Sequence, residues 1–165
     1  MSVVPERVSS EPRWFIHYLA RVHVSSATTG GAFSLLEMSA KTFDSPLHVH
    51  HHESETFYVL DGVLRVHVPG ESVELHAGDA YYTPLGVPQM YQVVSETARW
   101  LVLTAPGGFD EHIVDHSEPA PRDEIPTRNY VGQGPLPDKD ALRKRGHEIL
   151  GPPGTMPDAV PAPAS

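Results

Sequence analysis

Hydrophobic and polar residues alternate in short runs from Trp14 to Ala105, and turn-forming residues separate the runs. No stretch before Gly107 keeps a helical period over three turns. Short runs rich in Val, Leu, Phe and Tyr at spacings of about 8–12 residues favour an antiparallel barrel or sandwich. The predicted strands cover 14–18, 21–25, 31–38, 47–50, 55–60, 63–68, 73–75, 80–83, 91–94 and 99–103.

Three turn signals divide these runs. Asp61-Gly62 lies between two apolar runs and predicts a hairpin. Pro69-Gly70 predicts a second turn, and Ala77-Gly78-Asp79 a third.

The character of the chain changes after Ala105, because ten of the 17 prolines follow Ser117. The pattern predicts a helix over 109–115, an extended wrap or linker over 117–137 and a second helix over 138–150, which Gly151-Pro152 ends. We expect four regions: a flexible N-terminal segment over 1–13, a barrel over 14–105, a C-terminal wrap with one or two helices that packs outside the barrel over 106–150, and a disordered tail over 151–165.

Composition narrows the function classes. The 12 Lys and Arg residues against 21 Asp and Glu residues give a net charge of −9, which argues against binding to a nucleic-acid backbone. The absence of cysteine excludes disulfides, thiolate metal sites and cysteine nucleophiles. We find no apolar run long enough to span a membrane and no signal peptide in residues 1–13, so we expect a cytoplasmic protein.

Histidines are the candidate functional residues, because four of the 11 lie between His48 and His52. Residues i and i+2 of a strand share a face, so His48 and His50 would point to one place inside a barrel. Glu55 begins the next predicted strand, and two imidazoles with one carboxylate form a facial triad for a divalent transition metal. A histidine-rich surface loop is the alternative interpretation. We interpret His51 and His52 as loop residues, with His52 as a possible extra ligand or proton carrier because it shares the parity of His50.

The spacing around this cluster resembles a known family. His48 and His50 form His-x-His, four residues separate His50 from Glu55, and six separate Glu55 from Gly62. Gly78 and Pro84-Leu85-Gly86 follow at the spacing of a second motif. Together they resemble the two motifs of the cupins over Trp14 to Ala105. The resemblance implies an all-β, antiparallel jelly-roll barrel, here with a short C-terminal helical extension.

The chain departs from the cupin pattern at Gln89, where the second motif has its third histidine. Gln89 offers a carbonyl oxygen, which is a weaker ligand than an imidazole. Two interpretations stay open. Either His48, His50 and Glu55 hold one divalent metal with Gln89 as a weak or outer fourth group, or the site has decayed and the barrel binds an organic ligand without metal.

Strand parity also predicts the lining of a pocket. If Glu55 faces inward, so do Phe57 and Val59, and Leu36, Met38 and Tyr91 are assigned to the same interior. A mostly apolar lumen beside a metal suits a small aromatic or polyketide-like ligand. The alternative is that these side chains only fill the core of the barrel.

Four segments extend the resemblance to small single-domain cupins of the quercetin 2,3-dioxygenase-like kind: 29–37, 46–62, 105–109 and 146–153. That resemblance implies that the metal binds a flavonol hydroxyl and dioxygen, with Glu55 as the catalytic base. Our leading hypothesis is therefore an oxygenase that acts on an aromatic or enolisable small molecule with dioxygen, using iron, nickel, manganese, cobalt or zinc. The alternatives are a non-redox cyclase or isomerase and a non-catalytic binding barrel. We expect a homodimer, as is common for small cupins.

Overall fold

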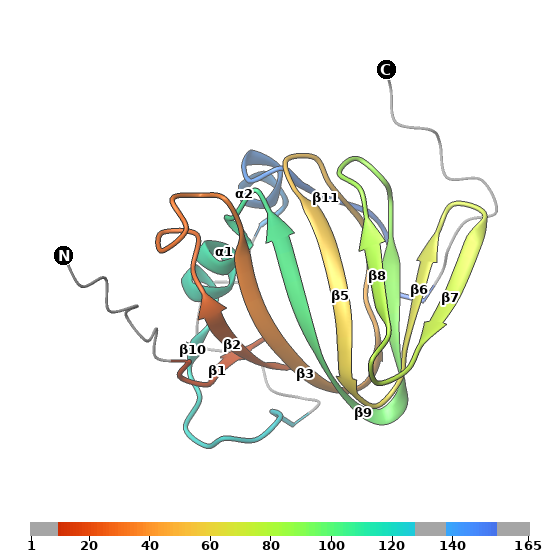
Figure 1. Cartoon of the computed structure of the whole chain (residues 1–165), viewed down its shortest axis with the longest axis horizontal. Helices are drawn as coiled ribbons and strands as arrows, with labels where there is room; N and C mark the ends of the chain where they lie inside the picture. Colours follow the sequence, from red (N-terminus) through yellow and green to blue (C-terminus); the bar gives the residue numbers. More distant parts are fainter. Residues whose placement is uncertain (1–9, 128–137, 155–165) are drawn as a thin grey trace.

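Antiparallel strands form the framework of the protein in a computed structural model, which describes residues 10–127 and 138–154. Two short helices, α1 (Phe109–Asp115) and α2 (Lys139–Lys144), lie on one side of the strands (Figure 1). The strands are β1 (Arg13–Phe15), β2 (Tyr18–Val24), β3 (Ser34–Asp44), β4 (Leu47–His50), β5 (Ser54–Asp61), β6 (Leu64–Val68), β7 (Glu71–Leu75), β8 (Ala80–Thr83), β9 (Met90–Ala105), β10 (Glu118–Pro119) and β11 (His147–Gly151).

The long strand β9 organises the sheets. The main sheet has the order β10-β1-β2-β3-β9-β5-β8, and β6 pairs with both β9 and β7. Val93 of β9 pairs with Leu64 of β6, whereas Trp100 pairs with Val59 of β5, so two parts of one strand hold different partners. β9 is continuous where the sequence predicted two strands, over 91–94 and 99–103. The arrangement confirms the all-β, antiparallel jelly roll and the helical extension after it.

The hairpin predicted at Asp61-Gly62 is wrong. The chain turns there, but β5 and β6 do not pair with each other, because each pairs with β9. Gly62 has a φ of 77°, and a Cβ added to it would lie 2.3 Å from the carbonyl oxygen of Thr97. The glycine is therefore required by the close approach of β9 rather than by a hairpin.

The long second helix predicted over 138–150 is also wrong. The helix α2 ends early, Gly146 follows it with a φ of 79°, and His147–Gly151 forms β11. Gly146 is the left-handed residue that commonly ends a helix, and it directs the chain into pairing with β4. The segment does not simply wrap the outside of the barrel, because β11 places His147 in a buried position beside His50.

The core fills the space between the two layers of strands. Its largest fully buried side chains include Trp100, Phe57, Leu36 and Leu64. Most of the N-terminal segment and of the tail, which we expected to be flexible and disordered, lies outside the described residues. Within the described part, no helix is long and apolar enough to cross a membrane.

Candidate metal centre and its cavity

His48, His50 and Glu55 converge on one point of the inner wall. β4 carries the two histidines, β5 carries Glu55, and an isolated antiparallel bridge aligns His48 with Gln89. One ligand atom of each of the three residues lies within 4.8 Å of the others, and His50 Nε2 is 3.6 Å from Glu55 Oε2. The structure therefore brings together the three residues that the sequence analysis selected as candidate ligands.

Both imidazoles use Nδ1 for an outer contact. His48 Nδ1 lies 2.8 Å from the carbonyl oxygen of Pro46, which only accepts, so this nitrogen carries the proton. His50 Nδ1 lies 3.0 Å from Glu53 Oε1 and donates to that carboxylate. When the ring is neutral, these contacts leave Nε2 of each histidine as a lone-pair donor, the arrangement that outer partners impose on metal-binding histidines.

Gln89 faces Glu55 through its amide nitrogen. Gln89 Nε2 donates a hydrogen bond to Glu55 Oε2, while Gln89 Oε1 is buried and has no hydrogen-bond partner. A buried acceptor without a donor is costly, and a cation is one group that satisfies it. The donor set of two imidazoles, a carboxylate and an orphan amide oxygen fits a divalent first-row ion.

Burial controls the protonation of the site. It raises the pKa of Glu55, although the His50 charge and the Gln89 hydrogen bond oppose the change. Burial and repulsion from His50 lower the pKa of His48 to about 3, so His48 is neutral at ordinary pH. Burial lowers the pKa of His50 as well, but the Glu55 and Glu53 carboxylates outweigh it, and the net change is a rise.

Two buried neighbours of the candidate centre, Glu53 and His147, were not selected by the sequence analysis. Glu53 Oε1 accepts hydrogen bonds from His50 Nδ1 at 3.0 Å and from His147 Nε2 at 2.6 Å, and all three residues are buried. Burial would raise the pKa of Glu53, but the hydrogen bonds from His147 and His50 prevail and lower it to about 2. Glu53 was detectable as a carboxylate three residues after His50, whereas no local signal joins His147 to the site.

A cavity of about 190 Å³ opens beside these residues. Met38, Phe57 and Tyr91 line it, as strand parity predicted, together with His48, His50 and Glu55. Leu36 and Val59 do not line it, because both are fully buried in the core behind its wall. The sequence analysis missed the lining residues of two other regions: Phe15, Ile16, His17 and Tyr18 around the β1–β2 turn, and Phe109, His112, Leu142, His147 and Ile149 after the barrel.

The two remaining histidines of the cluster lie outside this centre. His51 is exposed and contacts Glu148 at 3.0 Å, and His52 is exposed in the bend after β4. Neither belongs to the groups in the described part of the chain that could hold a metal ion. The expectation of loop residues fits these positions, and the parity argument for His52 fails because β4 ends at His50.

A jelly-roll barrel with His-x-His on one inner strand and a carboxylate on the next defines a class of metal-binding barrels. Residues 34–104 match the family model described as "Cupin domain". Residues 34–104 are therefore similar to a cupin domain, as the motifs suggested.

One curated relative is quercetin 2,3-dioxygenase of Bacillus subtilis, which is 34% identical over 94 residues, or 56% of this chain. The match covers 28% of the length of that enzyme. Over these residues the chain is similar to that dioxygenase, and it spans less than a third of the curated protein.

Solved structures share the fold. A variant of oxalate decarboxylase from Bacillus subtilis matches with a TM-score of 0.54 and 26% identity, over 64% of this chain and 29% of that one. The polyketide cyclase RemF from Streptomyces resistomycificus matches with a TM-score of 0.51 and 22% identity, over 64% of this chain and 80% of that one. The named relatives include a dioxygenase, a decarboxylase and a cyclase, all of which act on small molecules.

Proposed function

We propose that this protein is a metal-dependent oxygenase that acts on an aromatic or enolisable small molecule with dioxygen. The observation that carries the proposal is the set of convergent donors of His48, His50 and Glu55 at the wall of an apolar cavity. The similarity to quercetin 2,3-dioxygenase supports the dioxygen chemistry. In this proposal His48, His50 and Glu55 are the metal ligands, and Gln89 contributes its amide oxygen or acts just outside them.

The bound metal and the residues around it have separate roles in the proposed reaction. A bound iron, nickel, manganese or cobalt ion would supply the electrophilic, redox-active centre at which dioxygen is used. Glu55 accepts the proton of a substrate hydroxyl, and its raised pKa brings it closer to the range in which a carboxylate is an effective base. The hydrogen bond from Gln89 Nε2 holds Glu55 Oε2 in place, and apolar side chains keep water away from the reacting oxygen.

The chemistry of the cavity helps to choose among the activities of the relatives. Oxalate is a small dianion, and the decarboxylase that acts on it has Mn(II) centres. Among the described residues that line the cavity there is no Lys or Arg to pair with such an anion. The rings of Phe15, Phe57 and Tyr91 offer apolar surface instead. The lining therefore favours an aromatic substrate over oxalate.

A second candidate function is a non-redox cyclase or isomerase with the same ligands. The observation that favours it is Gln89, because an oxygen ligand is tolerated by a Lewis-acid zinc site. Glu55 would then move a proton on an enolisable substrate without consumption of oxygen.

Metal analysis and oxygen uptake separate these functions. Untagged protein would be purified without added metal and analysed by mass spectrometry, and then incubated with enolisable aromatic compounds in an oxygen electrode. One redox-active metal per chain and substrate-dependent oxygen uptake support the oxygenase. Product formation without oxygen uptake supports the cyclase or isomerase, and absence of both metal and turnover overturns both. His48→Ala is the test variant, and His76→Ala, an exposed histidine outside the cavity, is the matched control.

A further inference from the structure

Segments outside the matched domain close the cavity. β11 pairs with β4 so that His147 lies opposite His50 and Ile149 opposite His48. These two residues, with Leu142 of α2, cover the side of the cavity above the metal-binding strand. Residues that follow the matched region 34–104 therefore help to set the size of the cavity.

The volume limits the ligand. A cavity of about 150 Å³ is known to admit benzene in another protein. The cavity of about 190 Å³ has room for one substituted ring or two fused rings. A flavonol such as quercetin has three rings, so with β11 in its observed position part of it would have to extend through the opening of the cavity.

The walls select a flat ligand. Rings from separate elements surround the space. Phe15 and His112 pack edge to face at 5.7 Å, and Phe57 and Tyr91 pack with tilted rings at 5.4 Å. A planar aromatic molecule can continue this packing. Among the described lining residues Glu55 is the only acid and there is no Lys or Arg, which favours a neutral ligand.

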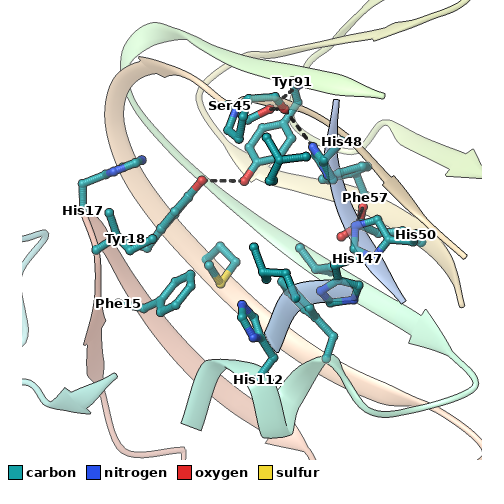
Figure 2. Close-up of a pocket in the computed structure, with 18 residues that line it drawn as sticks. Phe15, His17, Tyr18, Ser45, His48, His50, Phe57, Tyr91, His112 and His147 are labelled. Atoms are coloured by element: carbon teal, nitrogen blue, oxygen red, sulfur yellow. Dashed lines mark hydrogen bonds and ion pairs between the residues drawn. The ribbon is translucent and has the colours of Figure 1, made fainter. Parts of the chain in front are cut away.

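His112 is a polar residue of the cavity wall that has no role in the proposed oxygenase reaction. The His112 side chain extends from α1 into the space between Phe15 and His147 (Figure 2), and the residue is only 4% exposed. Its Nδ1 is buried without a hydrogen-bond partner. Phe109 stacks on the ring at 5.7 Å, so the imidazole is held in position. Burial, followed by repulsion from His147, lowers the pKa of His112 to about 3, and the ring is neutral.

A hydroxyl is the ligand group that matches this nitrogen. A neutral imidazole presents either an N–H or a lone pair at Nδ1, and a hydroxyl can accept from the first and donate to the second. A second contact is available at another side of the cavity, where the hydroxyls of Tyr18 and Tyr91 lie 2.7 Å apart (Figure 2). Only one proton of that pair is used between them, so the other remains free to donate.

We infer that the cavity binds a neutral aromatic molecule of one ring or two fused rings that carries a hydroxyl group, and that His112 Nδ1 is the specificity-determining contact for that hydroxyl. A three-ring flavonol, which the cavity cannot enclose, binds more weakly. The inference rests on the proposed function in one respect, since it names the substrate class of the same site. The binding of the ligand does not itself require turnover.

The test compares the binding of three probes: 2-naphthol, 2-methylnaphthalene and quercetin. Each probe is added to two preparations of the full chain, one treated with chelator and one loaded with zinc. Binding is measured by calorimetry. We expect 2-naphthol to bind about tenfold more tightly than 2-methylnaphthalene, which has a similar shape but no hydroxyl, and we expect quercetin to bind more weakly than 2-naphthol. Quercetin binding as tight as that of 2-naphthol would overturn the size limit.

The variants isolate His112. His112→Phe should weaken the binding of 2-naphthol by about tenfold and leave the affinity for 2-methylnaphthalene unchanged, because only the hydrogen bond is lost. His112→Asn, which keeps a polar atom near the position of Nδ1, should restore part of the preference, and His76→Phe should change nothing. Equal weakening of both naphthalenes by His112→Phe would overturn the specificity role. If the oxygenase proposal alone is wrong, oxygen uptake is absent while these preferences persist, so the two failures are distinguishable.

Discussion

Glu53→Gln tests whether the carboxylate between His50 and His147 stabilises the centre. The change keeps the size of the side chain but removes the charge that both imidazoles contact. Because the pKa of Glu53 falls from its ordinary 4.5 to about 2, the ionised carboxylate contributes roughly 3 kcal/mol to stability in the metal-free protein. We expect the variant to lose about 2–4 kcal/mol.

The two pKa shifts determine how the free energy of unfolding changes with pH. A lowered folded-state pKa of Glu53 means that its contribution is present above pH 4.5 and is lost as the pH falls toward 2. The pKa of His50 is raised, so its contribution is complete below pH 6.5 and is lost as the pH rises through the folded-state value. The difference between the wild type and Glu53→Gln should therefore be largest between about pH 4.5 and 6.5.

The assay is urea unfolding of metal-free protein from pH 3 to pH 8, with the free energy of unfolding extrapolated to water. Glu148→Gln is the control, because that carboxylate contacts the exposed His51. The same Glu53 variant should bind zinc about 10–100-fold more weakly in competition with a chelator, since His50 loses the partner that orients its ring. A stability difference that is constant across this pH range would refute the reasoning, as would unchanged zinc affinity.

Three further substitutions have defined outcomes. His50→Ala should abolish stoichiometric metal binding, measured by mass spectrometry, while His51→Ala retains it; full metal content in the first variant would move the site elsewhere. Gln89→His should tighten metal binding by roughly tenfold to a hundredfold in a chelator competition, and an unchanged affinity would mean that residue 89 does not reach the ion. In urea unfolding, Gly62→Ala should destabilise the fold by about 2 kcal/mol more than Gly70→Ala. Both glycines have a positive φ, but of the two only Gly62 lies so close to other atoms that an added Cβ would clash with them. Equal losses of stability would contradict this clash.

Local spacing was sufficient to predict the strands that carry the candidate metal ligands. His48 and His50 share a face because strand side chains alternate, and that rule needs no knowledge of the fold. The same alternation placed Phe57 and Tyr91 at the cavity. It could not separate them from Val59, which is equally inward but lies in the packed core, because alternation gives the face of a strand and not the depth along the barrel.

Tertiary structure alone decided how the centre is completed. Glu53 and His147 are 94 residues apart in the chain, and only the pairing of β11 with β4 makes them neighbours. Residues 147–151 continue a helical pattern in the sequence, but their backbone groups pair with β4, and this pairing outweighs a weak local helix preference. Which atom of Gln89 meets Glu55 was likewise decided by packing, since a carboxamide offers a donor and an acceptor on the same short side chain.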